Sequence, residues 1–476
     1  MIHCYKFDDL NIVLDTYSGS IHMVDPVAFD MISDFETKSR EETVANAIAK
    51  HGISEDEAEE CMCDIEELKD AGKLYAEDKY ADIPGVYRRR NYTIKALCLH
   101  VAHTCNLNCE YCFASQGKYH GKSALMSKEV GRRAMDFLIE HSGKHRNLDV
   151  DFFGGEPTLN MEVVKDVVAY GRELEKKYDK NIRFTLTTNG VLLDDEITEF
   201  CNKECYNVVL SLDGRREVND RFRVDYNGRG SYDTIVPHFQ KFVKARGDKS
   251  YYMRGTFTHF NTDFVNDIKQ MLDLGFNELS MEPVVTSPDS PSALTEEDLP
   301  VLFDQYEQLA HLLIERHNEG RPFTFYHYML DLTCGPCIYK RIAGCGSGTE
   351  YLAVTPTGDL YPCHQFVGDT KFKMGDIYTG IENLDLREEF ASCNAYSRAE
   401  CEDCWAKLYC SGGCAANSYH ATGKISGVYD YGCRVFKKRI ECAIAVKLKT
   451  MDVEQISGSG ANLNDDCSSC SDDFTT

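Results

Sequence analysis

The sequence predicts an α/β protein: a partial (β/α)6 TIM-like barrel with a small domain in front of it and a cysteine-rich region behind it. Two alternating patterns carry this prediction. Strand-like runs recur near residues 96–103, 148–154, 183–188, 207–213, 251–258 and 278–285. Amphipathic stretches separate most of them, near residues 127–142, 161–178, 232–245 and 263–273. Strands that alternate with helices form a parallel sheet, and this number of units suits an open, partial barrel.

Residues 1–82 are predicted to form a separate domain with a winged-helix outline. Residues 5–24 are typical of extended segments separated by a Ser-Gly turn, and helices are expected near 26–36, 40–51 and 54–71. Ser54 and Glu57 form a capping box at the start of the third helix, which should end at Gly72. A closing strand is expected over residues 73–76.

The negative charge of the chain indicates which kinds of molecule it can bind. Between residues 41 and 82 there are fourteen Asp and Glu residues against four Lys, and the whole chain carries a formal charge of −25. Phosphate contacts require positive charge, so we expect no nucleic-acid partner. An acidic domain suits a basic peptide, although a solvated acidic helix face is the alternative.

The remaining boundaries follow from changes in pattern. Residues 83–94 are expected to be a linker, 95–320 the barrel, 321–452 the cysteine-rich domain and 453–476 a disordered acidic tail. No apolar run reaches the roughly 18 residues of a membrane span, so no membrane partner is expected. The first residues do not resemble a signal peptide, which predicts a cytoplasmic protein. In that setting the 22 cysteines indicate metal binding rather than disulfides.

The first predicted strand of the barrel is followed by three cysteines. Cys105, Cys109 and Cys112 have the spacing C-x3-C-x2-C, with Tyr111 before the last cysteine. Structural zinc sites and ordinary iron–sulfur clusters take four protein ligands, whereas this motif has three. The motif therefore predicts a metal site with an open coordination position.

This motif resembles the signature of the radical S-adenosylmethionine (SAM) enzymes, in which three cysteines hold a 4Fe-4S cluster whose fourth iron binds the cofactor. Further motifs of that family follow later strands in the same order: Gly154-Gly-Glu-Pro157, Thr187-Thr-Asn-Gly190 and Ser211-Leu-Asp-Gly214. The resemblance implies that Glu156 accepts from the amino group of the methionine moiety, and that Ser211, Asp213 and Arg223 lie near its carboxylate and ribose. The implied cofactor-binding residues are Tyr111, Gly154, Gly155, Glu156, Pro157, Asn189, Ser211, Asp213 and Arg223.

Seven cysteines in the last third of the chain resemble the SPASM extension of radical SAM enzymes, which holds two auxiliary 4Fe-4S clusters. A zinc ribbon explains any single C-x2-C pair, but not seven cysteines in this order behind such a barrel. The resemblance implies that Cys345, Cys363 and Cys414 bind the first auxiliary cluster, and that Cys401, Cys404, Cys410 and Cys433 bind the second. The fourth position of the first cluster stays open, with Cys337 or Cys334 as a protein ligand and a substrate thiolate as the alternative.

Runs in the barrel, including Ser211–Arg221, Arg254–Thr258 and Ser280–Val285, resemble the maturases of SCIFF peptides. This resemblance implies thioether bridges, Cys to Thr, in a Cys-rich precursor bound through its leader. It also implies three 4Fe-4S clusters, SAM as cofactor, no catalytic side chain, and flavodoxin or ferredoxin as electron donor. Dehydrogenation, C–C crosslinking and sulfatase-type formylglycine formation are the alternative reactions. A non-catalytic metal-binding scaffold for a peptide is a further alternative.

Overall fold

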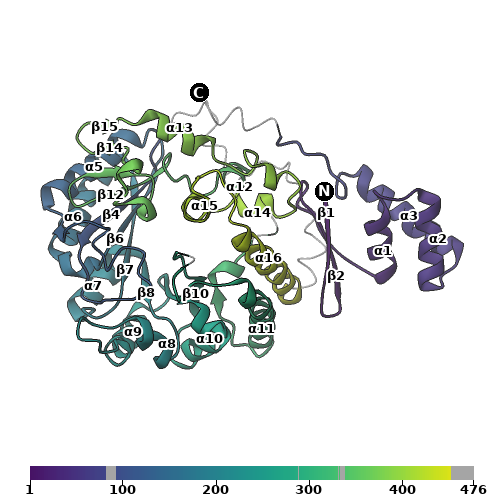
Figure 1. Ribbon diagram of the computed structural model, residues 1–476, viewed down its shortest axis with the longest axis horizontal. Helices are drawn as coiled ribbons and strands as arrows, with labels where there is room; N and C mark the ends of the chain where they lie inside the picture. The colour runs from purple at the N-terminus through teal and green to yellow at the C-terminus, as the bar shows by residue number, and fades with distance from the viewer. Residues whose placement is uncertain (82–92, 288, 331, 333–337, 452–476) are drawn as a thin grey trace.

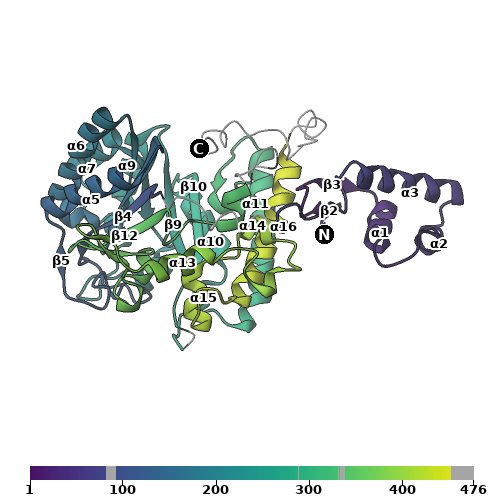
Figure 2. The same ribbon diagram turned by 90° about the horizontal axis from the view of Figure 1, so that it is seen from above.

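The computed structural model describes residues 1–81, 93–287, 289–330, 332 and 338–451. The predicted tail, most of the predicted linker, and both Cys334 and Cys337 lie outside this part of the chain. Figures 1 and 2 show one large body, from which the N-terminal helices project on one side.

Six parallel strands pair in the order in which they occur along the chain, which confirms the partial barrel. They are β4 (Ala96–His103), β6 (Asn147–Gly154), β7 (Asn181–Thr188), β8 (Cys205–Ser211), β9 (Tyr251–Phe257) and β10 (Glu278–Pro283). Short β5 (Ala124–Leu125) pairs antiparallel with β4, and β11 (Thr324–Phe325) pairs parallel with β10. Because the strands are parallel and in order, their carboxyl ends lie on one rim, where such folds build their sites.

Helices cover the outer face of this sheet. The four amphipathic stretches form α5 (Lys128–His141), α6 (Met161–Tyr178), α9 (Tyr232–Arg246) and α10 (Phe264–Asp273). Three more helices were not predicted: α7 (Asp195–Glu204), α8 (Arg216–Phe222) and α11 (Leu299–Asn318). The first two are too short for a clear periodicity, although Asp194 caps α7 and marks its start. No helix in the described ranges is long and apolar enough to cross a membrane.

The inner face of the barrel is polar. Along β9, Met253 and Phe257 are fully buried in the apolar core, while the alternate positions Tyr252, Arg254 and Thr256 are only half-buried. Successive side chains of a strand point to opposite faces, so the alternate set lines the interior. Branched apolar side chains fill the interior of a closed TIM barrel. The polar set found here leaves an interior suited to a polar ligand.

The cysteine-rich region extends the barrel sheet. β12 (Tyr351–Val354) pairs parallel with β4, and β13 (Asp359–Tyr361), β14 (Gly375–Asp376) and β15 (Gly380–Ile381) continue the sheet antiparallel. The helices of this region are α12 (Ile338–Ala343), α13 (Leu384–Ser392), α14 (Lys407–Cys410), α15 (Ala415–Thr422) and α16 (Asp430–Thr450). β12 lies beside the first half of β4, with Tyr351 opposite Ala96 and Val354 opposite Leu99.

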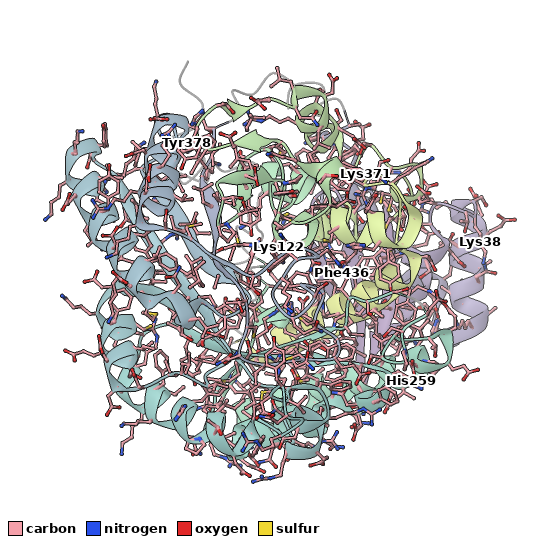
Figure 3. All side chains as sticks on the ribbon, turned by 60° about the vertical axis from the view of Figure 1, so that its left-hand side comes forward. Lys38, Lys122, His259, Lys371, Tyr378 and Phe436 are labelled. Atoms are coloured by element: carbon pink, nitrogen blue, oxygen red, sulfur yellow. The ribbon has the colours of Figure 1, made fainter. Side chains whose placement is uncertain are left out.

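The N-terminal region has an antiparallel sheet, β1 (Ile2–Phe7), β2 (Leu10–Asp15) and β3 (Ile21–Val24), followed by α1 (Pro26–Asp34), α2 (Arg40–His51) and α3 (Glu55–Asp70). The predicted capping box of Ser54 and Glu57 is present at α3, and a second one, of Ser39 and Glu42, starts α2. One sheet face packs on these helices through Val13, while Ile12 and Leu14 join the core of the main body. The sheet therefore lies between its own helices and α16, on which Figure 3 labels Phe436.

The predicted closing strand over residues 73–76 is wrong. The amides of Lys73 and Leu74 donate to the Leu68 carbonyl, which closes the last turn of α3. Tyr75 has a left-handed backbone (φ 52°), and the amide of Ala76 donates to the Asp15 carboxylate. These local bonds use the backbone donors that a strand would need for its ladder.

Candidate functional site

The loop that leaves the carboxyl end of β4 carries Cys105, Cys109 and Cys112. Burial raises the pKa of the Cys105 thiol to about 12 and that of Cys109 to about 11, and the charges of the neighbouring thiols add to this rise. Arg223 opposes the rise at Cys109. Thiols bind metal as thiolates, so a bound cation would offset the cost of this buried negative charge.

Hydrogen bonds to its sulfur would stabilise the thiolate form of Cys105. The Leu107 amide donates to Cys105 Sγ at 3.4 Å, and Asn189 Nδ2 lies 3.6 Å from the same atom. Asn189 also donates to Asn106 Oδ1 at 2.8 Å. The Nδ2 of Asn106 is buried and has no partner among the described residues. A buried donor without a partner at this position suits a bound polar group, and the sequence alone did not single out Asn106.

Gly154 and Gly155 allow the cysteine loop to pack on the end of β6. Gly154 has φ +122°, and a Cβ there would lie 2.3 Å from the Ala102 carbonyl oxygen. A Cβ on Gly155 would lie 2.1 Å from the carbonyl oxygen of Thr104. The glycine at each position is therefore explained by close contact between two backbone segments. Contact of these glycines with the methionine moiety remains a prediction.

Glu156 is almost fully buried and accepts four hydrogen bonds from the chain itself. The amide (3.1 Å) and hydroxyl (2.6 Å) of Thr158 and the hydroxyl of Thr188 (2.8 Å) donate to Oε1, and the Asn189 amide donates to Oε2 at 2.8 Å. Burial raises the pKa of this carboxyl, while the four donors lower it. Glu156 thus joins the end of β6, next to Pro157, to the end of β7. Its predicted bond to the methionine amino group would be additional to these contacts.

A buried cluster next to the cysteine loop contains Asp213, Arg223 and Tyr111. Asp213 accepts from Arg223 Nε at 2.8 Å and Nη2 at 3.1 Å, from the Tyr111 hydroxyl at 2.6 Å, and from the Thr256 amide at 3.0 Å. The partner of Arg223 in the structure is therefore Asp213. The cluster fixes the aromatic residue of the cysteine motif to β8 and β9. Ser211 ends β8 beside Arg254 of β9, on the polar interior of the barrel.

The cysteines of the C-terminal region fall into two groups. Burial raises the pKa of Cys363 to about 12, and the charges of Cys414 and Cys345 contribute. Burial also raises the pKa of Cys410 to about 12, with contributions from Cys433, Cys401 and Cys404. These charge interactions associate Cys363 with Cys414 and Cys345, and Cys410 with Cys433, Cys401 and Cys404.

The predicted ligands are all cysteines, which are the donors that iron–sulfur clusters take. In the described ranges, no three His, Cys, Asp or Glu side chains converge as one metal ion would require. In a cubane cluster, by contrast, each cysteine binds a different iron, so its ligands are spread further apart. The grouping supports the implied ligand sets, and iron at each set remains a prediction.

Aromatic rings link the first cysteine site to Cys363. Phe113, which follows Cys112, lies 5.6 Å from the ring of His364, which follows Cys363. Phe153 lies 5.0 Å from His364, and Tyr119 stacks on His103 at 4.7 Å. The pKa of His364 falls to about 4 because burial disfavours its charged form. These rings belong to no sequence motif, so only the tertiary structure shows that they form one wall between Cys112 and Cys363.

Charged groups occupy the barrel interior on the opposite strands. Glu282 Oε1 bonds His327 Nε2 at 2.9 Å, and Arg254 Nη2 lies 3.4 Å from Oε2. Burial raises the pKa of Glu282, but the bond and charge of His327 and the charge of Arg254 outweigh it and lower the pKa. On β6, burial raises the pKa of Asp151 to about 6. The interior therefore offers acidic and basic groups to a ligand.

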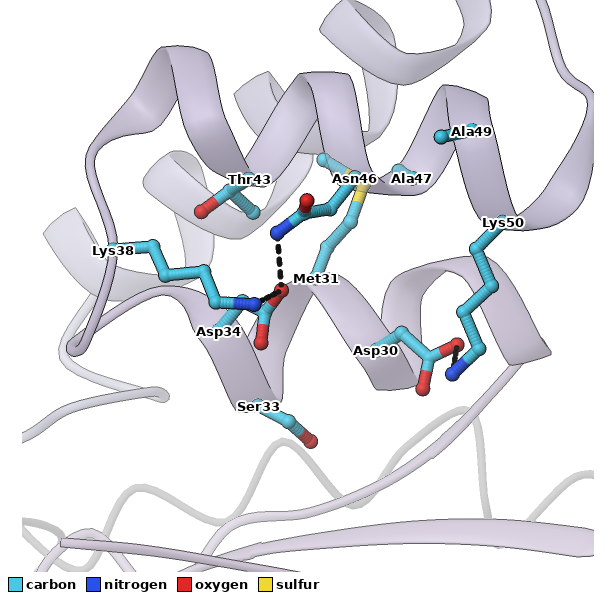
Figure 4. Close-up of a pocket in the computed structure, with 10 residues that line it drawn as sticks. All are labelled: Asp30, Met31, Ser33, Asp34, Lys38, Thr43, Asn46, Ala47, Ala49 and Lys50. Atoms are coloured by element: carbon cyan, nitrogen blue, oxygen red, sulfur yellow. Dashed lines mark hydrogen bonds and ion pairs between the residues drawn. The ribbon is translucent and has the colours of Figure 1, made fainter.

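A separate pocket of about 430 Å³ lies between α1 and α2 of the N-terminal region (Figure 4). Its charged side chains bond one another: Lys38 lies 2.7 Å from Asp34, and Lys50 lies 2.8 Å from Asp30. This pocket contains none of the predicted site residues.

Comparison with known proteins agrees with this arrangement. The Radical SAM superfamily profile matches residues 99–274, and the profile of the SPASM iron-sulfur cluster-binding domain matches residues 345–405. Residues 99–274 therefore form a radical SAM domain, and residues 345–405 belong to a SPASM domain. The radical SAM cyclopropyl synthase TigE of Paramaledivibacter caminithermalis is 24% identical over 72% of each chain. A cysteine-type anaerobic sulfatase-maturating enzyme of Clostridium novyi is 24% identical over 66% of this chain and 85% of its own.

Solved structures share the fold. The sulfatase-maturating enzyme anSMEcpe with bound AdoMet superposes with a TM-score of 0.60 at 21% identity, over 75% of this chain and all of its own. Streptococcus suis SuiB bound to its precursor peptide SuiA gives a TM-score of 0.54 at 15% identity, over 91% of this chain and all of its own. At these identities the likeness establishes the fold, and no reaction follows from it.

Proposed function

We propose that this radical SAM enzyme forms thioether crosslinks between a cysteine sulfur and a carbon, Cys to Thr, in a ribosomally synthesised, Cys-rich precursor peptide. The observation that carries the proposal is the 5.6 Å contact between Phe113 and His364, since these residues directly follow Cys112 and Cys363. With the proposed ligand sets, this contact supports a radical-generating site at Cys112 and a first auxiliary site at Cys363 on one wall. A substrate sulfur bound at the first auxiliary site would then lie close to the substrate hydrogen that is removed at the radical-generating site.

The atom balance of the reaction fits two such sites. One C–H and one S–H bond break and one C–S bond forms, so a hydrogen atom, a proton and an electron must leave. When bound, SAM and three 4Fe-4S clusters supply the acceptors for the hydrogen atom and the electron, and an external donor such as flavodoxin or ferredoxin restores the reduced state. The chain supplies the binding surfaces, and the rings of buried Tyr119 and partly buried Phe153 exclude water between the proposed sites.

His364 favours thioether formation over formylglycine formation. Sulfatase maturases resemble this chain but carry an aspartate directly after the cysteine equivalent to Cys363, as a base. Here that position holds His364, which is packed against Phe113 and Phe153 and has a pKa near 4. A histidine with so low a pKa is a weak base. A cysteine sulfur that bonds directly to carbon needs no such group.

The N-terminal domain supports a peptide substrate. Among the described strands, β3 is an edge of its sheet, because it pairs with β2 alone. An extended leader could add to that edge, with the acidic helices attracting its basic side chains. SuiB covers more of this chain than anSMEcpe does, and the difference is close in size to this domain.

The product identifies the reaction. The anaerobically reconstituted enzyme, SAM, a reductant and a Cys-rich precursor with a basic leader should give a product that has lost two hydrogens and one alkylatable thiol per bridge. Loss of sulfur would instead indicate formylglycine, and loss of two hydrogens with every thiol still free would indicate dehydrogenation or a C–C bond. Absence of SAM cleavage would identify a scaffold.

Leader binding is tested separately at the β3 edge. Met23→Pro removes a backbone N–H, whereas the matched control Met23→Thr keeps it; Met23 is exposed, so both changes are made at the surface. In fluorescence anisotropy, Met23→Pro should weaken leader binding and Met23→Thr should not. Binding to the wild-type protein should also weaken as salt rises. Equal affinities of the two variants would exclude strand addition at this edge.

A further inference from the structure

The segment between two cysteines of the second auxiliary set is in contact with the N-terminal domain. Trp405, which follows Cys404, stacks its indole on the imidazole of His3, with ring centroids 3.9 Å apart and planes inclined by 4°. The Thr16 hydroxyl donates to the Trp405 carbonyl at 3.1 Å. One side chain and one backbone group of this loop are therefore held by β1 and by the residue after β2.

Lys407 forms a second contact in the same loop. Its side chain is 3% exposed, and its ammonium donates to the Tyr17 hydroxyl at 3.1 Å and to Asp78 Oδ2 at 3.3 Å. The rings of Tyr17 and Tyr396 lie 4.9 and 4.6 Å from the ammonium, and Tyr396 donates to Asp78 at 2.9 Å. A buried ammonium is stable only with such partners, and two of them, Tyr17 and Asp78, belong to the N-terminal domain.

A different part of the domain contacts the main body away from this loop. In the turn between β1 and β2, Asp8 bonds His311 of α11 at 3.0 Å and Asp9 bonds Lys449 of α16. The two sets share no residue, although His3 also bonds Glu441 of α16 at 2.9 Å. They provide a test variant and a matched control within one interface.

We propose that the N-terminal domain completes the second auxiliary cluster site by holding the Cys404–Cys410 loop in place. Docking of the domain and retention of iron by Cys401, Cys404, Cys410 and Cys433 are then coupled. This coupling is reciprocal: a ligand that loosens the domain loosens the cluster loop by the same free energy. The proposal rests on the assignment of these four cysteines as cluster ligands and is independent of the bond that the enzyme forms.

The test uses the full chain, reconstituted anaerobically. The test variant combines His3→Ala with Tyr17→Phe, and the control combines Asp8→Asn with Asp9→Asn. Iron release to a chelator and quenching of Trp405 fluorescence by iodide are measured for both. Because Trp405 is the single tryptophan of the chain, its fluorescence reports on this loop alone.

The test variant should release about four irons at least about fivefold faster than the wild type, the factor expected when a site opens 1 kcal/mol more easily. Its Trp405 should become more accessible to iodide, and the control should match the wild type in both measurements. Faster quenching with unchanged iron release would overturn the coupling, and so would unchanged quenching. An equal iron content in the wild type and Cys401→Ala would remove the cluster assignment and the proposal with it.

Discussion

Replacement of Arg223 by methionine tests whether the buried cluster holds the cofactor loop. Asp213 is fully buried, and Arg223 supplies its only positively charged partner among the hydrogen bonds described above. Loss of one partner of a buried ion pair leaves an uncompensated charge and costs about 3–5 kcal/mol. Because Tyr111 bonds the same carboxylate, the cysteine loop should loosen as well.

Urea unfolding under anaerobic conditions gives the stability change from the shift in midpoint at constant slope. Arg216→Met is the matched control, since Arg216 begins α8, whose C-cap is Arg223, and pairs with Asp233 at the surface. It should unfold like the wild type. Equilibrium dialysis should show weaker SAM binding for Arg223→Met and unchanged binding for the control.

A second substitution separates charge from packing. In Asp213→Asn/Arg223→Met the buried side chain is neutral. Its amide oxygen can accept from the Thr256 amide, and its NH2 group can donate to the Tyr111 hydroxyl, so most of the lost stability should return. The reasoning is refuted if Arg223→Met costs no more than the surface control, or if the double variant is no more stable than Arg223→Met.

Three further predictions follow from the site. Replacement of Cys105, Cys109 and Cys112 by alanine should lower the iron content from about twelve to about eight per chain and abolish 5′-deoxyadenosine formation, whereas deoxyadenosine from this variant would exclude the radical assignment. The pKa of Asp151 rises from 3.8 to about 6 on folding, so its contribution to stability is full below about pH 4 and is lost as the pH rises through 6. Asp151→Asn should therefore stabilise the protein by about 3 kcal/mol at pH 7 and by less at pH 5 in urea unfolding, and an equal gain at both pH values would contradict the pKa. Glu156→Gln places an amide against four hydrogen-bond donors, so this variant should bind SAM more weakly in equilibrium dialysis. The control Glu162→Gln, on the exposed start of α6, should bind SAM as the wild type does. Equal weakening in the two variants would exclude a specific role of Glu156.

The sequence by itself determined the features that depend on neighbours along the chain. Alternation of strand-like and amphipathic runs located all six barrel strands, because the apolar residues that face the covering helices recur along each strand itself. The capping box of α3 was readable for the same reason, since both partners lie within four residues. Local patterns also produced the error at residues 73–76, where a short apolar run closes a helix instead of extending a sheet.

Tertiary structure alone decided which partners meet across the chain. The motifs predicted that Glu156 and Arg223 lie at the site, but not that each is already bonded to other residues of the chain. Asn189, which bonds Glu156, follows another strand, and Asp213 is separated from Arg223 by α8. No sequence pattern indicates that Phe113 meets His364, or that His3 stacks on Trp405, which lies some four hundred residues away. Such contacts depend on how the sheet and helices pack, and the packing free energy is spread over the whole core rather than written in any one segment.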